Sequence, residues 1–119
     1  MEERNQPMAV TSSVSNKKTA IGGLAGGAGK LPPQAIDLEE AVLGALMLEK
    51  EALSQVIDIL KPEAFYVEKN QLVFRAIQRL FEQSKPVDLL TVTQELRQQG
   101  TLEKVGGAFY IAELTNRVA

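Results

Sequence analysis

Two adjacent prolines, Pro32 and Pro33, constrain this chain more than any other feature of its sequence. Proline cannot occupy a helix interior, and it restricts the residue before it to extended conformations. Residues 35–46 follow at once, acidic near their start and then densely apolar. The prolines therefore predict a rigid, extended segment that directly precedes a buried helix at the start of a domain.

The segment before the prolines, residues 1–30, is expected to be a disordered tail, because Ser, Thr, Asn and Gly dominate it and aromatic residues are absent. Residues 24–31 at its end look like a phosphate-binding P-loop. However, Leu24 stands where the first glycine belongs, and Leu31 stands where the motif has Ser or Thr. We therefore interpret this stretch as a flexible linker, and we expect no cofactor to bind this fragment.

Residues 31–119 are predicted to form an all-α domain, a compact bundle of about six helices, since apolar residues recur every three or four positions. Long helices are expected near residues 37–48, 51–60 and 68–83, then between Asp88 and Gly100, and from Ala108 onward. Asp88 is the expected N-cap of the fourth helix and Gly100 its C-terminal stop. Short turns are expected near residues 63–65 and 101–105.

Three features of the first long helix bear on its packing and chemistry. Leu38 is expected on its buried face, whereas Glu39 and Glu40 are placed in its first turn, where they complement the helix dipole. They do not suit a general-acid pair, because neighbouring helical residues point about 100° apart. Gly44 in the helix interior predicts the close approach of a second helix.

Gly106-Gly107 is either an anion site at a helix start or, as we favour, a turn that needs positive φ.

Composition excludes several classes of function. The chain has no Cys and no His, so disulfides, zinc sites of the Cys/His kind, and Ser-His-Asp or Cys-His catalysis are all excluded. No catalytic or metal-binding residue is predicted. Four of the 13 bases and two of the 15 acids lie in the first thirty residues, so the rest carries nine bases against thirteen acids. That acidic balance is poorly suited to gripping phosphates. With no membrane-spanning or signal segment, a cytoplasmic location is expected.

Five blocks after the tail carry a family resemblance. They are residues 31–34, residues 39–45, residues 59–63 with Phe65 and Tyr66, residues 86–91, and residues 105–107 with Tyr110. In this order and spacing they resemble the N-terminal domain of the bacterial replicative DNA helicase, the DnaB-type family. Ala35 stands where Asn is expected after Gln34.

The resemblance implies a hexameric ring that unwinds DNA at the replication fork. A RecA-like motor domain would use ATP and Mg²⁺ to move along single-stranded DNA. The N-terminal domain would form a collar, assemble the ring through contacts between copies, and receive primase with its helical hairpin. By this comparison the chain is a non-catalytic fragment that ends before the hairpin and the motor.

Candidate partner-interface residues are Phe65, Tyr66, Lys69, Arg75 and Arg79. The alternatives are that the two aromatic residues form a hinge packed under the third helix and that the three bases form a solvated face. A helix-turn-helix DNA-binding regulator over residues 88–118 is the alternative function, although its recognition helix would offer only one base. A small enzyme is a third, less favoured hypothesis, because titratable residues do not cluster at catalytic spacing.

Overall fold

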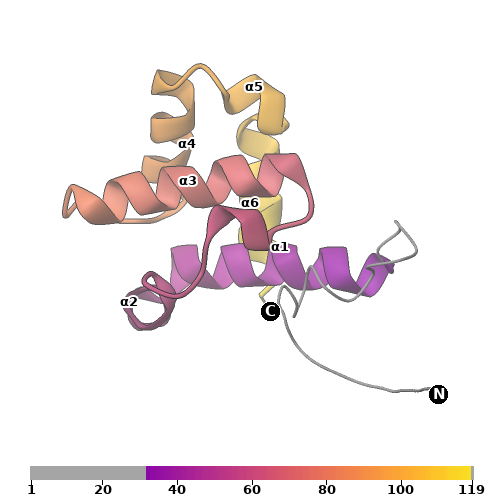
Figure 1. Ribbon diagram of the computed structural model, residues 1–119. Helices are drawn as coiled ribbons and strands as arrows, with labels where there is room; N and C mark the ends of the chain where they lie inside the picture. The colour runs from indigo at the N-terminus through magenta and orange to yellow at the C-terminus, as the bar shows by residue number, and fades with distance from the viewer. Residues whose placement is uncertain (1–31, 119) are drawn as a thin grey trace.

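The computed structural model describes residues 32–118 (Figure 1). The expected tail and the P-loop-like stretch lie outside these residues. Within them the chain is all-α, as its periodicity predicted, and contains no strand. The elements are α1 (Pro33–Leu48), α2 (Lys50–Val56), the 3-10 turn η3 (Pro62–Ala64), α3 (Glu68–Glu82), α4 (Leu89–Gln98), α5 (Leu102–Val105) and α6 (Gly107–Asn116). None of the described helices is long and apolar enough to cross a membrane.

Helix α1 begins four residues earlier than its apolar pattern predicted. Pro32 is the extended N-cap, and Pro33 is the first helical residue, a position where proline's missing N–H removes no helical bond. The acids that were assigned to the first turn therefore lie deeper in the helix. Leu38, expected on the buried face, is 52% exposed, whereas Glu39 is 0% exposed. The helix-dipole interpretation of Glu39 and Glu40 is consequently wrong.

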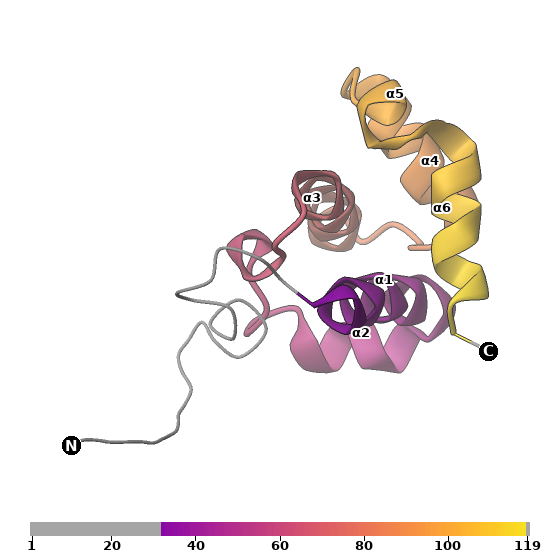
Figure 2. The same cartoon turned by 90° about the vertical axis from the view of Figure 1, so that its right-hand side faces the viewer.

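The core lies where α1, α3, α4 and α6 meet. Helix α3 is central, and its residues Val73, Phe74, Ala76 and Ile77 are fully buried. Helices α1 and α3 run side by side, and α6 passes across them from α5 at one end to α1 at the other (Figure 1 and Figure 2). This crossing brings the last helix of the chain against the first.

Gly44 permits the close contact between α1 and α6. A Cβ atom at this position would lie 2.0 Å from the Leu114 carbonyl oxygen of α6. The predicted purpose of this mid-helix glycine, close approach of a second helix, is confirmed. The contact fixes how near α6 comes to α1.

Helix ends follow the sequence signals closely at α4 and α6. The Asp88 carboxylate accepts a hydrogen bond from the Thr91 amide at 2.9 Å, and the Thr91 hydroxyl accepts one from the Asp88 amide at 2.9 Å. Gly106 and Gly107, with φ of +110° and +77°, make the predicted turn into α6. The second helix instead ends at Val56, earlier than predicted, and residues 57–59 continue as a turn.

Candidate functional site

The predicted interface residues do not form one surface. Phe65 is 1% exposed, and its ring lies 5.3 Å from the ring of Phe74 in the core. The expectation that Phe65 contacts a partner is therefore corrected, because burial under α3 leaves it no free surface. Tyr66 beside it is half exposed.

The three bases of α3 also separate. Lys69 places its ammonium 4.0 Å from the ring centre of Tyr110 on α6. Arg79 donates from Nε to Glu95 of α4 at 2.7 Å. This hydrogen bond lowers the pKa of the Glu95 carboxyl and outweighs the opposing effect of burial. Arg75 is partly exposed. An interface role for Tyr66, Lys69, Arg75 and Arg79 stays a prediction.

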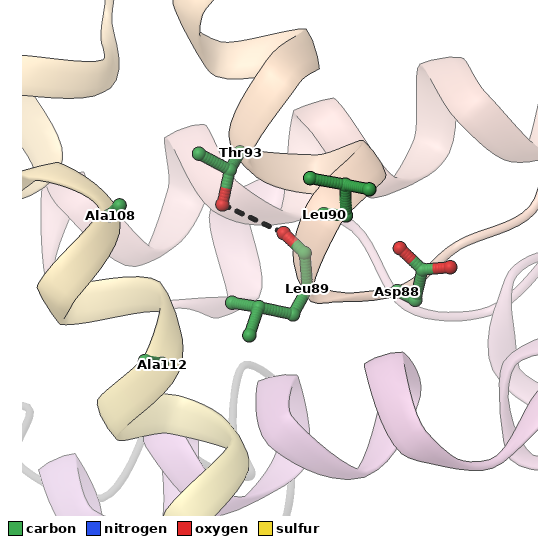
Figure 3. Close-up of a pocket in the computed structure, with 6 residues that line it drawn as sticks. All are labelled: Asp88, Leu89, Leu90, Thr93, Ala108 and Ala112. Atoms are coloured by element: carbon green, nitrogen blue, oxygen red, sulfur yellow. Dashed lines mark hydrogen bonds between the residues drawn. The ribbon is translucent and has the colours of Figure 1, made fainter.

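A shallow hollow of about 530 Å³, open to solvent, lies between α4 and α6, and we call it the apolar groove (Figure 3). Its lining residues come from the start of each helix: Asp88, Leu89, Leu90, Thr93, Ala108 and Ala112. The Leu89 side chain lies between the two helices (Figure 3). Leu90 is 69% exposed, and Phe109, next to Ala108 in the chain, is 76% exposed. A large exposed apolar side chain, Leu90, therefore lines an apolar hollow, and Phe109 is exposed elsewhere on the first turn of α6.

The polar groups of the apolar groove are already occupied. The Thr93 hydroxyl donates to the Leu89 carbonyl oxygen at 2.7 Å, and the Asp88 carboxylate caps α4. Small-molecule sites combine apolar walls with a few convergent polar groups that orient the ligand. Since its two polar side chains already hold the first turn of α4, the apolar walls of this hollow suit an apolar protein side chain better than a cofactor or substrate.

Sequence reasoning missed the apolar groove for an identifiable reason. By helical spacing, Leu89 shares one face of its helix with Val92, Thr93 and Leu96. The last three are buried, but Leu89 is 40% exposed. Helical spacing identifies an apolar face, and it cannot distinguish a face that packs in the core from one that is left for a partner.

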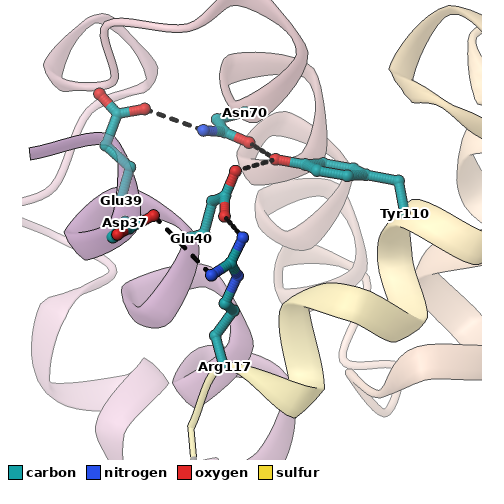
Figure 4. A network of polar contacts seen from close by, with 6 residues as sticks. All are labelled: Asp37, Glu39, Glu40, Asn70, Tyr110 and Arg117. Carbon is teal, nitrogen blue, oxygen red and sulfur yellow. Dashed lines mark hydrogen bonds and ion pairs between the residues drawn. The ribbon is translucent and has the colours of Figure 1, made fainter. Parts of the chain in front are cut away.

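A second cluster, the polar network, joins α1, α3 and α6 (Figure 4). It comprises Asp37, Glu39 and Glu40 of α1, Asn70 of α3, Tyr110 of α6 and Arg117 directly after α6. The Glu39 carboxylate accepts hydrogen bonds from the backbone N–H groups of Tyr66 and Val67, immediately before α3. Helix α3 has no side-chain cap from its own N-cap residue, Val67. Glu39 therefore caps α3 from another helix.

Hydrogen bonding in the polar network runs in one direction. A carboxylate can only accept, so Asn70 presents its amide Nδ2 to Glu39 Oε1, at 2.9 Å. That orientation turns Asn70 Oδ1 toward Tyr110, whose hydroxyl donates to it. Burial and the neighbouring Glu40 raise the pKa of the Tyr110 hydroxyl above its ordinary value of 10.0. The hydroxyl consequently keeps its proton and remains a donor.

The outer part of the polar network is ionic. Arg117 lies 2.9 Å from Glu40 and 3.8 Å from Asp37. Residues 107–116 of α6 contain no base, and Arg117 is paired with α1, so α6 offers no unpaired cationic side chain to phosphates. This arrangement does not favour the helix-turn-helix alternative. No group of three or more acidic residues in residues 32–118 could hold a metal ion.

The polar network also had a signal in the sequence. Glu39 lies midway between Ala35 and Leu43, four residues from each, and both of these are buried. Positions four apart share a helix face. An acid in an apolar stripe indicates a buried carboxylate that needs donors from elsewhere in the fold.

Comparisons with known proteins identify relatives of this chain. The family model of the DnaB-like helicase N terminal domain matches residues 31–119. A replicative DNA helicase DnaB of Rhodothermus marinus is 59% identical over 92 residues, which are 77% of this chain and 10% of the relative. The corresponding helicase of Geobacillus stearothermophilus is 45% identical over 89 residues, 75% of this chain and 20% of the relative.

A solved structure agrees with the sequence relatives. The crystal structure of the N-terminal domain of DnaB helicase from Mycobacterium tuberculosis superposes with a TM-score of 0.69 at 39% identity. The match covers 73% of this chain and 63% of that one. The chain spans only a tenth to a fifth of the length of the curated relatives named above. By sequence and fold alike, the chain belongs to the family of DnaB-like helicase N terminal domains.

Proposed function

We propose that this domain is the non-catalytic assembly module of a hexameric replicative DNA helicase. The apolar groove is its contact with a second copy of the same domain. ATP, Mg²⁺ and single-stranded DNA are handled by a motor domain in a part of the whole protein that this chain does not span. Family membership supports the helicase assignment, and the bacterial cytoplasm is the compartment that it implies. The observation that carries the self-association is the pairing of exposed apolar side chains with an apolar hollow.

A second copy is the occupant that the groove fits best. Leu90 lines the hollow and is mostly exposed, so one surface carries both a protruding and a receiving element. Two copies related by a twofold axis could each insert into the other, because such an interface uses the same patch on both partners. The groove side chains are uncharged except Asp88, which is occupied as a cap. Asp88 keeps its negative charge as a cap, so each copy brings one carboxylate and no other charged side chain to this contact.

Sedimentation equilibrium of the chain tests the proposed contact. The wild type is expected to associate weakly, with an average mass that rises with concentration toward that of a dimer. Leu90→Asp should remain monomeric, because it places a carboxylate on the patch. Ile59→Asp is the matched control, since Ile59 is 75% exposed and lies outside the groove. The proposal fails if Leu90→Asp associates like the wild type, or if Ile59→Asp abolishes association equally.

Primase is the second proposed partner, which family membership suggests. Tyr66 and Arg75 are two of the predicted contact residues with exposed surface. Binding of a primase C-terminal domain to Arg75→Glu, compared with the exposed control Arg97→Glu on α4, tests this part. Weaker binding for the first variant alone is expected. Equal binding by both variants and the wild type would remove Arg75 from the contact.

A further inference from the structure

Helix α6 has two faces with different tasks. Tyr110, Leu114 and Arg117 face α1 and α3, whereas Ala108 and Ala112 line the apolar groove. At about 100° per residue, the mean directions of the two sets lie about 180° apart around the helix axis. Any rotation of α6 that displaces the anchored face therefore displaces the groove face by the same angle.

The three anchors restrain α6 in different ways. Leu114 approaches α1 through its backbone carbonyl over Gly44, which sets the distance between the two helices. Arg117 is 44% exposed and holds only the end of the helix. Tyr110 lies between the two groove alanines in sequence, and its hydroxyl meets Asn70, which is fully buried. A directional hydrogen bond at that point restrains rotation most effectively.

The restraint extends beyond one bond. Asn70 cannot turn its amide without losing its bond to Glu39, and Glu39 is held by two backbone N–H groups before α3. The position of the Tyr110 hydroxyl is thus fixed by the N-terminal end of α3. The polar network ties the rotation of α6 to the placement of α1 and α3 (Figure 4).

We infer that Tyr110 is a positioning residue for the self-association surface: through Asn70 and Glu39 it sets the rotation of α6 and thereby the shape of the apolar groove. This inference rests on the proposed function, because it states how a buried network controls the shape of the groove through which two copies are proposed to associate. A rotation of about 20° would move each Cα atom of the groove face by about 0.8 Å. A shift of that size in one partner disturbs the packing of a closely packed interface.

Tyr110→Phe tests the inference because it removes the hydroxyl and keeps the ring that packs beside Lys69. Association is expected to weaken by up to about tenfold, because freeing α6 to rotate lowers the fraction of molecules whose groove has the associating shape, and affinity falls with that fraction. Gln71→Leu is the matched control. It removes another side-chain hydrogen bond of α3, the 2.8 Å bond from Gln71 Nε2 to the Phe65 carbonyl oxygen, which does not involve α6.

Methyl NMR distinguishes a change in the position of α6 from a general loss of stability of the domain. Both substitutions are introduced into the monomeric Leu90→Asp background, with labelled alanine methyl groups. We expect Tyr110→Phe to shift the Ala108 and Ala112 signals and Gln71→Leu to leave them unchanged. The inference is overturned if those signals stay in place in Tyr110→Phe, or if the control shifts them equally.

A second variant keeps the test decisive if Tyr110→Phe does not fold. Arg117→Gln removes the exposed anchor at the end of α6, and it should shift Ala112 in the same monomeric background. An unmoved Ala112 signal would contradict the anchoring of α6. Failure of the wild type to associate at any concentration would instead refute the proposed function. The methyl shifts would still decide whether the polar network positions α6.

Discussion

Replacing Gly44 by alanine should destabilise this domain, although alanine is the better helix former. In a helix interior the substitution would ordinarily add about 1 kcal/mol of stability. Here the new Cβ would lie 2.0 Å from the Leu114 carbonyl oxygen and 2.7 Å from Val118 Cγ2. Because the first of these atoms is backbone, no change of side-chain rotamer removes the clash, and α6 must move away from α1.

The size of the effect follows from that displacement. Contacts between heavy atoms are comfortable at about 3.5 Å, so the helices must separate locally by more than about 1 Å. Leu43 and Leu114, both fully buried, lose part of their packing when this happens. Overpacking a core costs about 1–3 kcal/mol, and this case belongs at the upper end. After the gain in helix propensity is subtracted, a net loss of about 2 kcal/mol is expected.

Urea denaturation followed by far-UV circular dichroism measures this loss. The midpoint should fall for Gly44→Ala, while the slope of the transition stays close to that of the wild type. Ser54→Ala supplies the control, because Ser54 is exposed on α2 and the alanine there meets no second helix. That variant should be as stable as the wild type or slightly more so. A Gly44→Ala midpoint at or above the wild-type value would refute the close contact of α1 with α6.

Three further predictions concern other parts of the fold. Asp88→Ala should lower the free energy of unfolding by about 0.5–2 kcal/mol through loss of the α4 cap, and an unchanged urea midpoint would contradict the cap. Ser84 has φ of +58°, so Ser84→Gly should raise stability by about 0.5 kcal/mol; a lower melting temperature would contradict this. The pKa of Glu95 is lowered from 4.5 by the hydrogen bond from Arg79, so its carboxylate stabilises the fold above pH 4.5 and loses that effect as the pH falls through the lower folded value. The stability difference between wild type and Glu95→Gln should therefore narrow in acid, whereas a difference that is constant with pH would contradict the pairing.

Local chemistry explains which features were predictable from sequence. Three features could be recognised from a few neighbouring residues, because each needs a particular residue type. They are the Asp88 cap, the Gly106-Gly107 turn and the close approach at Gly44. Helix boundaries were less predictable where two signals competed. Pro33 can begin a helix or precede one, and the structure shows that it begins α1.

The polar network depends on partners that local patterns do not reveal. Glu39 and Asn70 are 31 residues apart, and Asn70 and Tyr110 are 40 apart. The position of Glu39 in an apolar stripe was visible in the sequence, but which donors reach it is decided by how the helices cross. The apolar groove was hidden for a related reason, since exposure of Leu89 depends on the spacing of α4 and α6.

Capping of α3 by Glu39 has a consequence for how the domain folds. A helix with a cap in its own sequence can form its first turn before tertiary contacts exist. Helix α3 receives its cap from a residue 27 positions before Tyr66, so its first turn lacks that support until α1 has docked. Amide protons of Tyr66 and Val67 should therefore exchange with solvent only when the whole domain opens, instead of fraying as helix ends usually do. The carboxylate makes docking of α1 and completion of α3 a single cooperative event.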